Sequence, residues 1–112
     1  MKNILLSFCC IFILHLSAKA QVIYSTDYKS EAKVNVYVTS YKSEADLIVY
    51  KTDYKSEANK NNGIWYFSNY KSEADKTIFF TTYKSEANLI IYFTAYKSEA
   101  GWNKKSKMHL MY

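Results

Sequence analysis

The sequence predicts a mainly β repeat protein made of six short units, each a strand followed by a tight corner. The first observation is the pentapeptide Tyr-Lys-Ser-Glu-Ala, which occurs six times in 112 residues. The second is that β-branched and aromatic residues precede each copy, and these residue types favour strands over helices. The third is that none of the six corners has the Asn-Gly or Asp-Gly pair of ordinary hairpins. Near-identical corners imply that every link makes the same geometric step.

Residues 1–20 have the layout of a secretory signal peptide. Lys2 supplies a positive charge, residues 4–14 form an apolar run, and Ala18-Lys19-Ala20 provides a small-residue cleavage site. We expect cleavage before Gln21. The apolar run is too short to cross a bilayer, which takes about 20 residues. The alternative, a buried N-terminal strand or helix, is disfavoured because the three parts stand in the order of a signal peptide.

Export has consequences for the stability of the chain. Both cysteines, Cys9 and Cys10, lie inside the apolar run, so the cleaved chain contains none. Small secreted domains commonly depend on disulfides, whereas this one must depend on packing. No second apolar stretch is long enough for a membrane span. We therefore expect an exported protein without a membrane span, in the periplasm, at the cell surface or outside the cell.

The charge pattern disfavours a nucleic-acid partner. The chain has a formal net charge of +5 from fifteen lysines and ten acidic residues, with no arginine. Nucleic-acid binders cluster Lys and Arg on one surface, but six of the fifteen lysines here each stand two residues before a glutamate. The clearest basic cluster, Lys104-Lys105-Ser106-Lys107, is interpreted as part of a solvated basic tail over residues 104–112.

The repeats divide the chain into two halves. Successive copies of the pentapeptide are 13, 13, 16, 13 and 13 residues apart, and a fixed period indicates a repeat architecture. The longer central step separates halves of about residues 21–62 and 63–103, joined by a turn or linker at residues 59–63. The tyrosine and serine of each copy form the structural repeat motif: Tyr28, Ser30, Tyr41, Ser43, Tyr54, Ser56, Tyr70, Ser72, Tyr83, Ser85, Tyr96 and Ser98.

Each expected strand has two different faces, because side chains alternate along an extended chain. One face carries an aromatic residue four positions before the motif tyrosine: Tyr24, Tyr37, Tyr50, Tyr66, Phe79 and Tyr92. A hydroxyl residue follows on that face: Thr26, Thr39, Thr52, Ser68, Thr81 and Thr94. The other face carries Val36, Val49, Trp65, Ile78 and Ile91, then Val38, Phe67, Phe80 and Phe93. Because both faces are largely apolar in the later repeats, we expect strands buried on both sides.

The corners predict one helical turn each. Ser43 with Asp46, and Ser72 with Asp75, resemble a helix-capping arrangement, so we interpret Ser-Glu-Ala-Asp as a turn capped by the serine hydroxyl. Thirteen residues cannot hold a βαβ crossover, which needs roughly 30. They are also fewer than the 20 or more residues of leucine-rich or helical repeats.

The residue pattern of the repeat resembles that of a known family. The pattern aromatic-x-Thr-x-Tyr-x-Ser-x-Ala-Asp, followed by an apolar run, occurs at residues 37–50 and resembles the septoil knot family. These are small repeat proteins whose backbone is described as a 7(1) torus knot. The resemblance covers about residues 22–103 and implies two pseudo-symmetric halves interlocked as a knot. The third repeat departs from the pattern at Lys60-Asn61-Asn62, and the sixth ends in Gly101-Trp102-Asn103. No catalytic residue is implied by the family.

The residues themselves predict no catalytic, cofactor or metal site. After cleavage one histidine remains, His109, and the histidine clusters of zinc sites are absent. An active site needs unique, differently tuned groups, so six equal serine–glutamate pairs are better explained as six equal corners. Carboxylates at Asp27, Glu31, Asp53 and Glu57 could bind calcium, but the glycine-rich calcium-repeat pattern is missing.

Two classes of non-enzymatic function remain. The first is a secreted structural or interaction module, a monomer whose partners the sequence does not identify. The alternative is a protein that binds glycans or other extended polymers through exposed tyrosines. For the tyrosines we favour core packing with the hydroxyl at the edge. The exposure of these side chains distinguishes the two classes.

Overall fold

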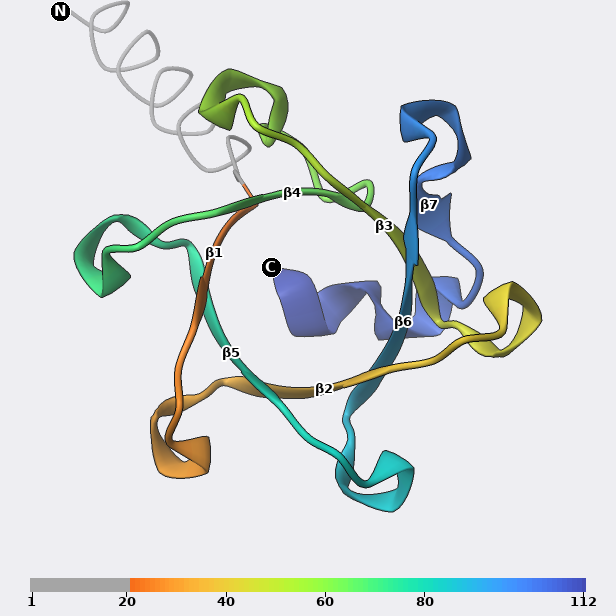
Figure 1. Ribbon diagram of the computed structural model, residues 1–112, viewed down its shortest axis with the longest axis horizontal. Coiled ribbons are helices and arrows are strands. Elements are labelled where there is room, and N and C mark those ends of the chain that lie inside the picture. The colour runs from red at the N-terminus through yellow and green to blue at the C-terminus, as the bar shows by residue number, and fades with distance from the viewer. Residues whose placement is uncertain (1–20) are drawn as a thin grey trace, which may run out of the picture.

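The computed structural model describes residues 21–112, which form a closed barrel of six parallel strands (Figure 1). The strands are β1 (Val22–Ser25), β2 (Val34–Val38), β3 (Leu47–Lys51), β4 (Ile64–Phe67), β5 (Lys76–Phe80) and β6 (Leu89–Thr94). Their order is β4-β1-β5-β2-β6-β3, and a pairing of β3 with β4 closes the ring. A short strand, β7 (Gly101–Trp102), pairs antiparallel with the start of β3. The expected signal peptide lies outside the described residues.

Strands of the two halves alternate around the barrel. We call β1, β2 and β3 the first half and β4 to β7 the second half. Within residues 21–112 every strand pairing joins the first half to the second. Neither half therefore has a sheet of its own, and each completes the other. The predicted mainly β repeat fold with interlocked halves is confirmed.

The central connection makes a different step from the other links, and the alternation of the halves explains why. Each link within a half passes over one strand of the other half, as from β1 past β5 to β2. In a ring of six, a third such step would return the chain to the position of β1. The link from β3 to β4 makes a shorter step to the neighbouring position, and Gly63 turns the chain there with φ +88°. A Cβ atom at Gly63 would collide with the backbone oxygen of Ile48, so only glycine fits.

Each corner is a single turn of 3₁₀ helix made by Lys-Ser-Glu. The six turns are η1 (Lys29–Glu31), η2 (Lys42–Glu44), η3 (Lys55–Glu57), η4 (Lys71–Glu73), η5 (Lys84–Glu86) and η6 (Lys97–Glu99). In η2, for example, the N–H of Ala45 donates to the carbonyl of Lys42 at 3.3 Å. The expected helical turn is present, but it is a 3₁₀ turn and begins one residue earlier than predicted.

The predicted serine cap is wrong. The N-cap residue of each of the six turns is the motif tyrosine, whose side chain makes no capping hydrogen bond, and motif serines such as Ser43 are exposed. The hydroxyl two positions before the motif tyrosine holds the corner instead. The Thr39 hydroxyl accepts a hydrogen bond from the N–H of Tyr41 at 3.1 Å. The same bond occurs at all six corners, from Thr26, Thr39, Thr52, Ser68, Thr81 and Thr94.

The core fills the inside of the barrel. Its middle layer consists of the residues five positions before each motif tyrosine, and all six are fully buried: Ile23, Val36, Val49, Trp65, Ile78 and Ile91. The outward aromatic residues, such as Tyr37 and Phe79, are only half-buried. The strands are therefore fully buried on their inner face only, and the expectation that both faces are buried was wrong for the outer face.

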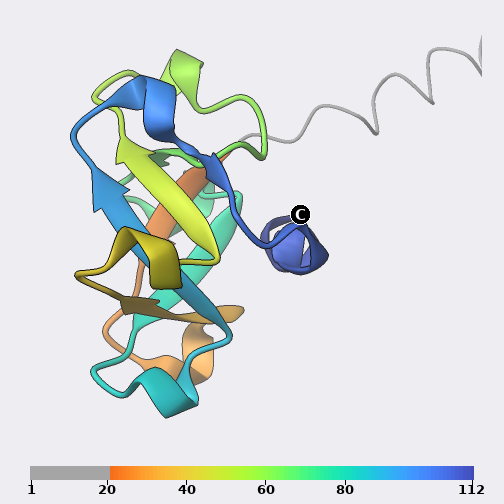
Figure 2. The same ribbon diagram turned by 90° about the vertical axis from the view of Figure 1, so that its right-hand side faces the viewer.

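The chain after residue 103 is not a solvated tail, which corrects the prediction. Residues Lys105–Met111 form a 3₁₀ helix, η7, that covers one mouth of the barrel (Figure 2). Met111 is buried in the core cluster, and its carbonyl accepts a hydrogen bond from the side-chain amide of Gln21 at 2.9 Å. Lys107 forms an ion pair with the buried Asp46 at 3.2 Å. The segment packs against the barrel through apolar residues such as Met111, although it also contains lysines.

Candidate functional site

The six motif tyrosines are surface residues. Each is between 65% and 68% exposed, at the point where a strand enters its corner. The preference for core packing was therefore wrong for these tyrosines. Six equivalent aromatic rings, Tyr28, Tyr41, Tyr54, Tyr70, Tyr83 and Tyr96, are presented around the barrel.

The lysine and glutamate of the motif form a closed ring of ion pairs. Each motif lysine reaches the motif glutamate of a corner in the other half, and the pairs follow the order of the strands around the barrel. The N–O distances are 3.0 Å for Lys29–Glu86, 2.7 Å for Lys84–Glu44, 3.3 Å for Lys42–Glu99, 2.8 Å for Lys97–Glu57, 3.7 Å for Lys55–Glu73 and 3.4 Å for Lys71–Glu31. The repetition of the motif thus has a physical reason, because every corner must supply one charge of each sign.

Hydrogen bonds at the corners favour the charged forms of several ring members. Bonds from Lys97 and then from the Thr52 hydroxyl lower the pKa of Glu57. The Thr94 hydroxyl, which donates at 2.6 Å, and then Lys42 lower the pKa of Glu99. The hydrogen bond to Glu44 raises the pKa of Lys84. The charged forms of Glu57, Glu99 and Lys84 are thus favoured by their partners in the ring and by the corner hydroxyls.

Two of the four candidate calcium carboxylates are held by other partners. Glu31 accepts hydrogen bonds from Thr26 and Lys71, and Glu57 accepts them from Thr52 and Lys97. Over residues 21–112 there is no group of three or more His, Cys, Asp or Glu side chains that could hold a metal ion.

His109 is exposed on η7, with its Nδ1 atom 3.0 Å from the Ser106 carbonyl oxygen. In the part of the chain that the structure describes, no helix has the length and apolarity needed to cross a membrane.

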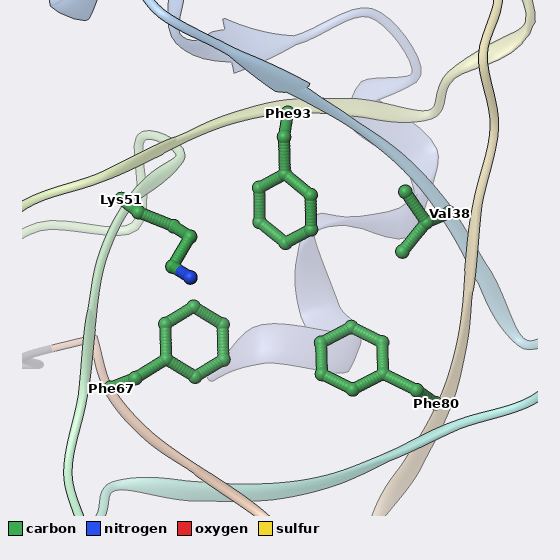
Figure 3. A pocket seen from close by; sticks show the side chains of 5 residues that line it. All are labelled: Val38, Lys51, Phe67, Phe80 and Phe93. Atoms are coloured by element: carbon green, nitrogen blue, oxygen red, sulfur yellow. The ribbon is translucent and has the colours of Figure 1, made fainter.

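A pocket opens at the end of the barrel away from η7. Its volume is about 430 Å³, and it is lined by side chains from five of the six barrel strands: Val38, Lys51, Phe67, Phe80 and Phe93 (Figure 3). The rings of Phe67 and Phe80 lie 6.3 Å apart, and the Phe93 ring lies 6.4 and 6.5 Å from them. The Lys51 ammonium group lies over two of these rings, 5.2 Å from the centre of Phe67 and 5.8 Å from that of Phe93.

Sequence reasoning identified four of these residues as an apolar strand face and missed both the pocket and Lys51. The signal was present at the position three residues before each motif tyrosine. The second half has phenylalanine there in all three repeats, whereas the first half has Ser25, Val38 and Lys51. The two halves thus differ systematically at this mouth of the barrel.

Comparison with known proteins places the chain in a family. A family model described as the 7(1) septoil knot domain matches residues 20–103. No curated protein and no solved structure matches the chain. The match covers the six strands, their corners and β7, and it confirms the resemblance inferred from the residue pattern of the repeat.

Proposed function

Because the chain belongs to the septoil knot family, whose domain is a structural repeat fold and not a known enzyme family, we propose that it is an exported interaction scaffold. Its ligand is a glycan or another extended polymer, bound through the motif tyrosines. The observation that carries this proposal is the exposure of all six tyrosines at equivalent places.

The chemistry of tyrosine suits such a ligand. A tyrosine ring offers an apolar face for stacking and a hydroxyl for hydrogen bonds. Because single contacts of this kind are weak, affinity must come from several corners that engage one chain at the same time. A polymer with repeating units can meet repeated rings in this way. A small ligand can use only one ring.

The scaffold supports presentation of the tyrosines in fixed places. The closed barrel leaves its strands without the free edges that promote unwanted pairing. The ion-pair ring ties each corner to its neighbour, for example η1 to η5 through Lys29 and Glu86. The hydroxyl two positions before each motif tyrosine fixes the backbone at the tyrosine itself, as Thr39 does for Tyr41.

Export is supported by the position of the expected cleavage site. Residues 1–20 have the layout of a signal peptide, and β1 begins at Val22. Cleavage before Gln21 would leave all six barrel strands in the mature chain. The intact mass of exported protein tests this part of the proposal, and export with Met1 retained would contradict it.

Affinity electrophoresis through gels that contain soluble polysaccharides tests the binding. A polysaccharide ligand should retard the wild-type protein. Retardation should fall when Tyr28, Tyr41 and Tyr54 are replaced by alanine, and it should vanish when all six motif tyrosines are replaced. The matched control replaces Ser30, Ser43 and Ser56 at the same corners by alanine, which should leave retardation unchanged. Equal retardation of the six-tyrosine variant and the wild type would overturn the proposal, as would a lack of retardation on every polymer tested.

A further inference from the structure

We propose that the open mouth of the barrel is a binding site for a small aromatic carboxylate. The mouth-lining residues are Val38, Lys51, Phe67, Phe80 and Phe93 (Figure 3). This site is separate from the polymer surface proposed above, because the motif tyrosines lie on the corners and not inside the barrel.

The two mouths of the barrel are treated differently by the chain. At one mouth η7 closes the core, with Met111 buried against the inner residues. At the other mouth three phenylalanine side chains remain half-exposed, and no segment of residues 21–112 covers the pocket that they line. A cluster of aromatic side chains left open to solvent is typical of a site for a ligand or partner.

The pocket has a floor and a size that suit a small molecule. The fully buried middle layer of the core lies beneath it, and the edge of Trp65 contacts Phe67 with ring centres 6.0 Å apart. A ligand can therefore enter only from the open end. The volume of about 430 Å³ lies within the range of known small-molecule sites, roughly 300 to 1,000 Å³. The three phenylalanine rings, of which Phe67 and Phe80 are stacked and Phe93 is tilted to both, offer faces and edges against which a further aromatic ring can pack.

Lys51 decides the charge of the ligand. It belongs to the inner face of β3, and its ammonium group lies over the rings of Phe67 and Phe93. It is not a member of the ion-pair ring, and no carboxylate forms an ion pair with it among the described residues. An anionic group on the ligand would pair with this ammonium while its ring packs against phenylalanine. Charge complementarity therefore favours an aromatic carboxylate over a neutral aromatic molecule.

The break in the repeat supports a specific site. The six corners are near-identical, as a purely structural device requires. The mouth is not: one half contributes three phenylalanines, and the other contributes Ser25, Val38 and Lys51. A small-molecule site needs an apolar wall and a few well-placed polar groups. Because the two halves differ at the mouth, the pocket has an aromatic side and a side that carries a single cation.

The experiment titrates the cleaved chain, residues 21–112, with 2-naphthoate and follows proton NMR of the aromatic side chains. Saturable shifts of the Phe67, Phe80 and Phe93 rings are expected. Lys51→Met should weaken binding of 2-naphthoate about tenfold, because a charge-assisted hydrogen bond is lost. The same variant should leave the binding of uncharged 2-naphthalenemethanol nearly unchanged. Lys105→Met, on the exposed side of η7, is the matched control and should bind both probes like the wild type.

A second variant separates the pocket from the rest of the surface. Val38→Trp adds a ring at the mouth, where Val38 is partly exposed, and should abolish binding while the thermal melt stays that of a folded protein. Binding that survives Val38→Trp would overturn the proposal, as would the absence of saturation at millimolar 2-naphthoate. Concentration-dependent dimerisation that Val38→Trp abolishes would assign the mouth to a second copy of the chain and would equally overturn it.

Discussion

The side-chain amide of Gln21 donates a hydrogen bond to the backbone carbonyl of Met111 at 2.9 Å, across 90 positions of the sequence. The backbone N–H of Gln21 donates to the carbonyl of Ala58 at 2.7 Å, so this glutamine joins β1 to the chain between η3 and β4 as well as to η7. The first residue after the expected cleavage site is thus buried and structural. Three distant segments meet at the mouth that η7 covers.

Removal of the Met111 side chain should destabilise the whole barrel. Met111 is 1% exposed and belongs to the core cluster. Met111→Ala should lower the free energy of unfolding by about 2 to 4 kcal/mol, the usual cost of truncating a buried methionine. Urea denaturation followed by circular dichroism measures the change. Lys105→Ala on the exposed side of the same helix should shift the midpoint little, and equal midpoints for the two variants would show that η7 does not close the core.

The corner hydroxyls should matter more than the motif serines. Thr39→Val keeps the shape of the side chain but leaves the N–H of Tyr41 without its acceptor, which should cost about 1 to 2 kcal/mol. Ser43→Ala at the same corner should have almost no effect, because the Ser43 side chain is exposed and caps nothing. Paired urea midpoints decide between them. A larger loss for Ser43→Ala than for Thr39→Val would restore the serine-cap hypothesis.

The ion-pair ring should make stability depend on pH at both extremes. The pKa values of Glu57 and Glu99 are lowered in the folded state, so their contribution is complete above the ordinary glutamate pKa of about 4.3. It is lost as the pH falls through the lower pKa of the folded protein. The raised pKa of Lys84 has the opposite sign: its contribution is complete below the ordinary lysine pKa of about 10.4 and disappears as the pH rises above it.

A variant with Glu57→Gln and Glu99→Gln tests the acid limb. Its urea midpoint should fall less steeply with acid than that of the wild type. Asp27→Asn, at an exposed acid outside the ring, is the control and should keep the wild-type slope. The wild-type midpoint should also fall at high salt, because exposed ion pairs are screened. A wild-type profile in the double variant would show that these two glutamates do not contribute.

Neither half should fold alone. All strand pairings in residues 21–112 cross between the halves, so residues 21–62 alone would lack every neighbour of β1, β2 and β3. We expect the separate halves to give circular dichroism and proton NMR spectra of unfolded or aggregated chains. Residues 21–112 should unfold as one cooperative unit. A monomeric half with dispersed signals and a cooperative melt would contradict the interleaved barrel.

The repeat predicted the fold well because its period depends on local chemistry. The alternation of residues such as Val36 and Tyr37 identifies strands, and the identical corners imply identical steps. The serine cap failed because a second hydroxyl, equally close in sequence, takes the role: Thr39, directly after β2, accepts the hydrogen bond from the N–H of Tyr41, whereas Ser43 is exposed. Asp46 instead accepts a hydrogen bond from the N–H of Ile90 at 2.9 Å, a contact between the halves that no local pattern contains.

The surface and the pocket were harder to predict for a different reason. Core packing was favoured for the tyrosines because a buried ring can keep its hydroxyl at the edge, but the motif repeats because its lysine and glutamate form the ion-pair ring, as Lys84 and Glu44 do. The lysines near Met111 led to the prediction of a solvated tail, so the apolar side of η7 was not predicted. Lys51 could not be identified as a pocket residue from the sequence. Its place in the pocket depends on which face of β3 points inward and on phenylalanines 16 and 42 residues away.

The alternation of halves also limits how such a protein can evolve. A linear solenoid can gain or lose a unit at either end, because each unit contacts only its neighbours. Here one additional 13-residue unit in the first half would add a strand with no counterpart from the second half, and the ring could not close in the same register. A larger barrel would need one new unit in each half at the same time. Its circumference would be wider, and its interior would need additional side chains to fill it. Recombination between the near-identical pentapeptides is therefore harmful whenever it changes their number, so related genes should vary in the side chains of the units and keep their count.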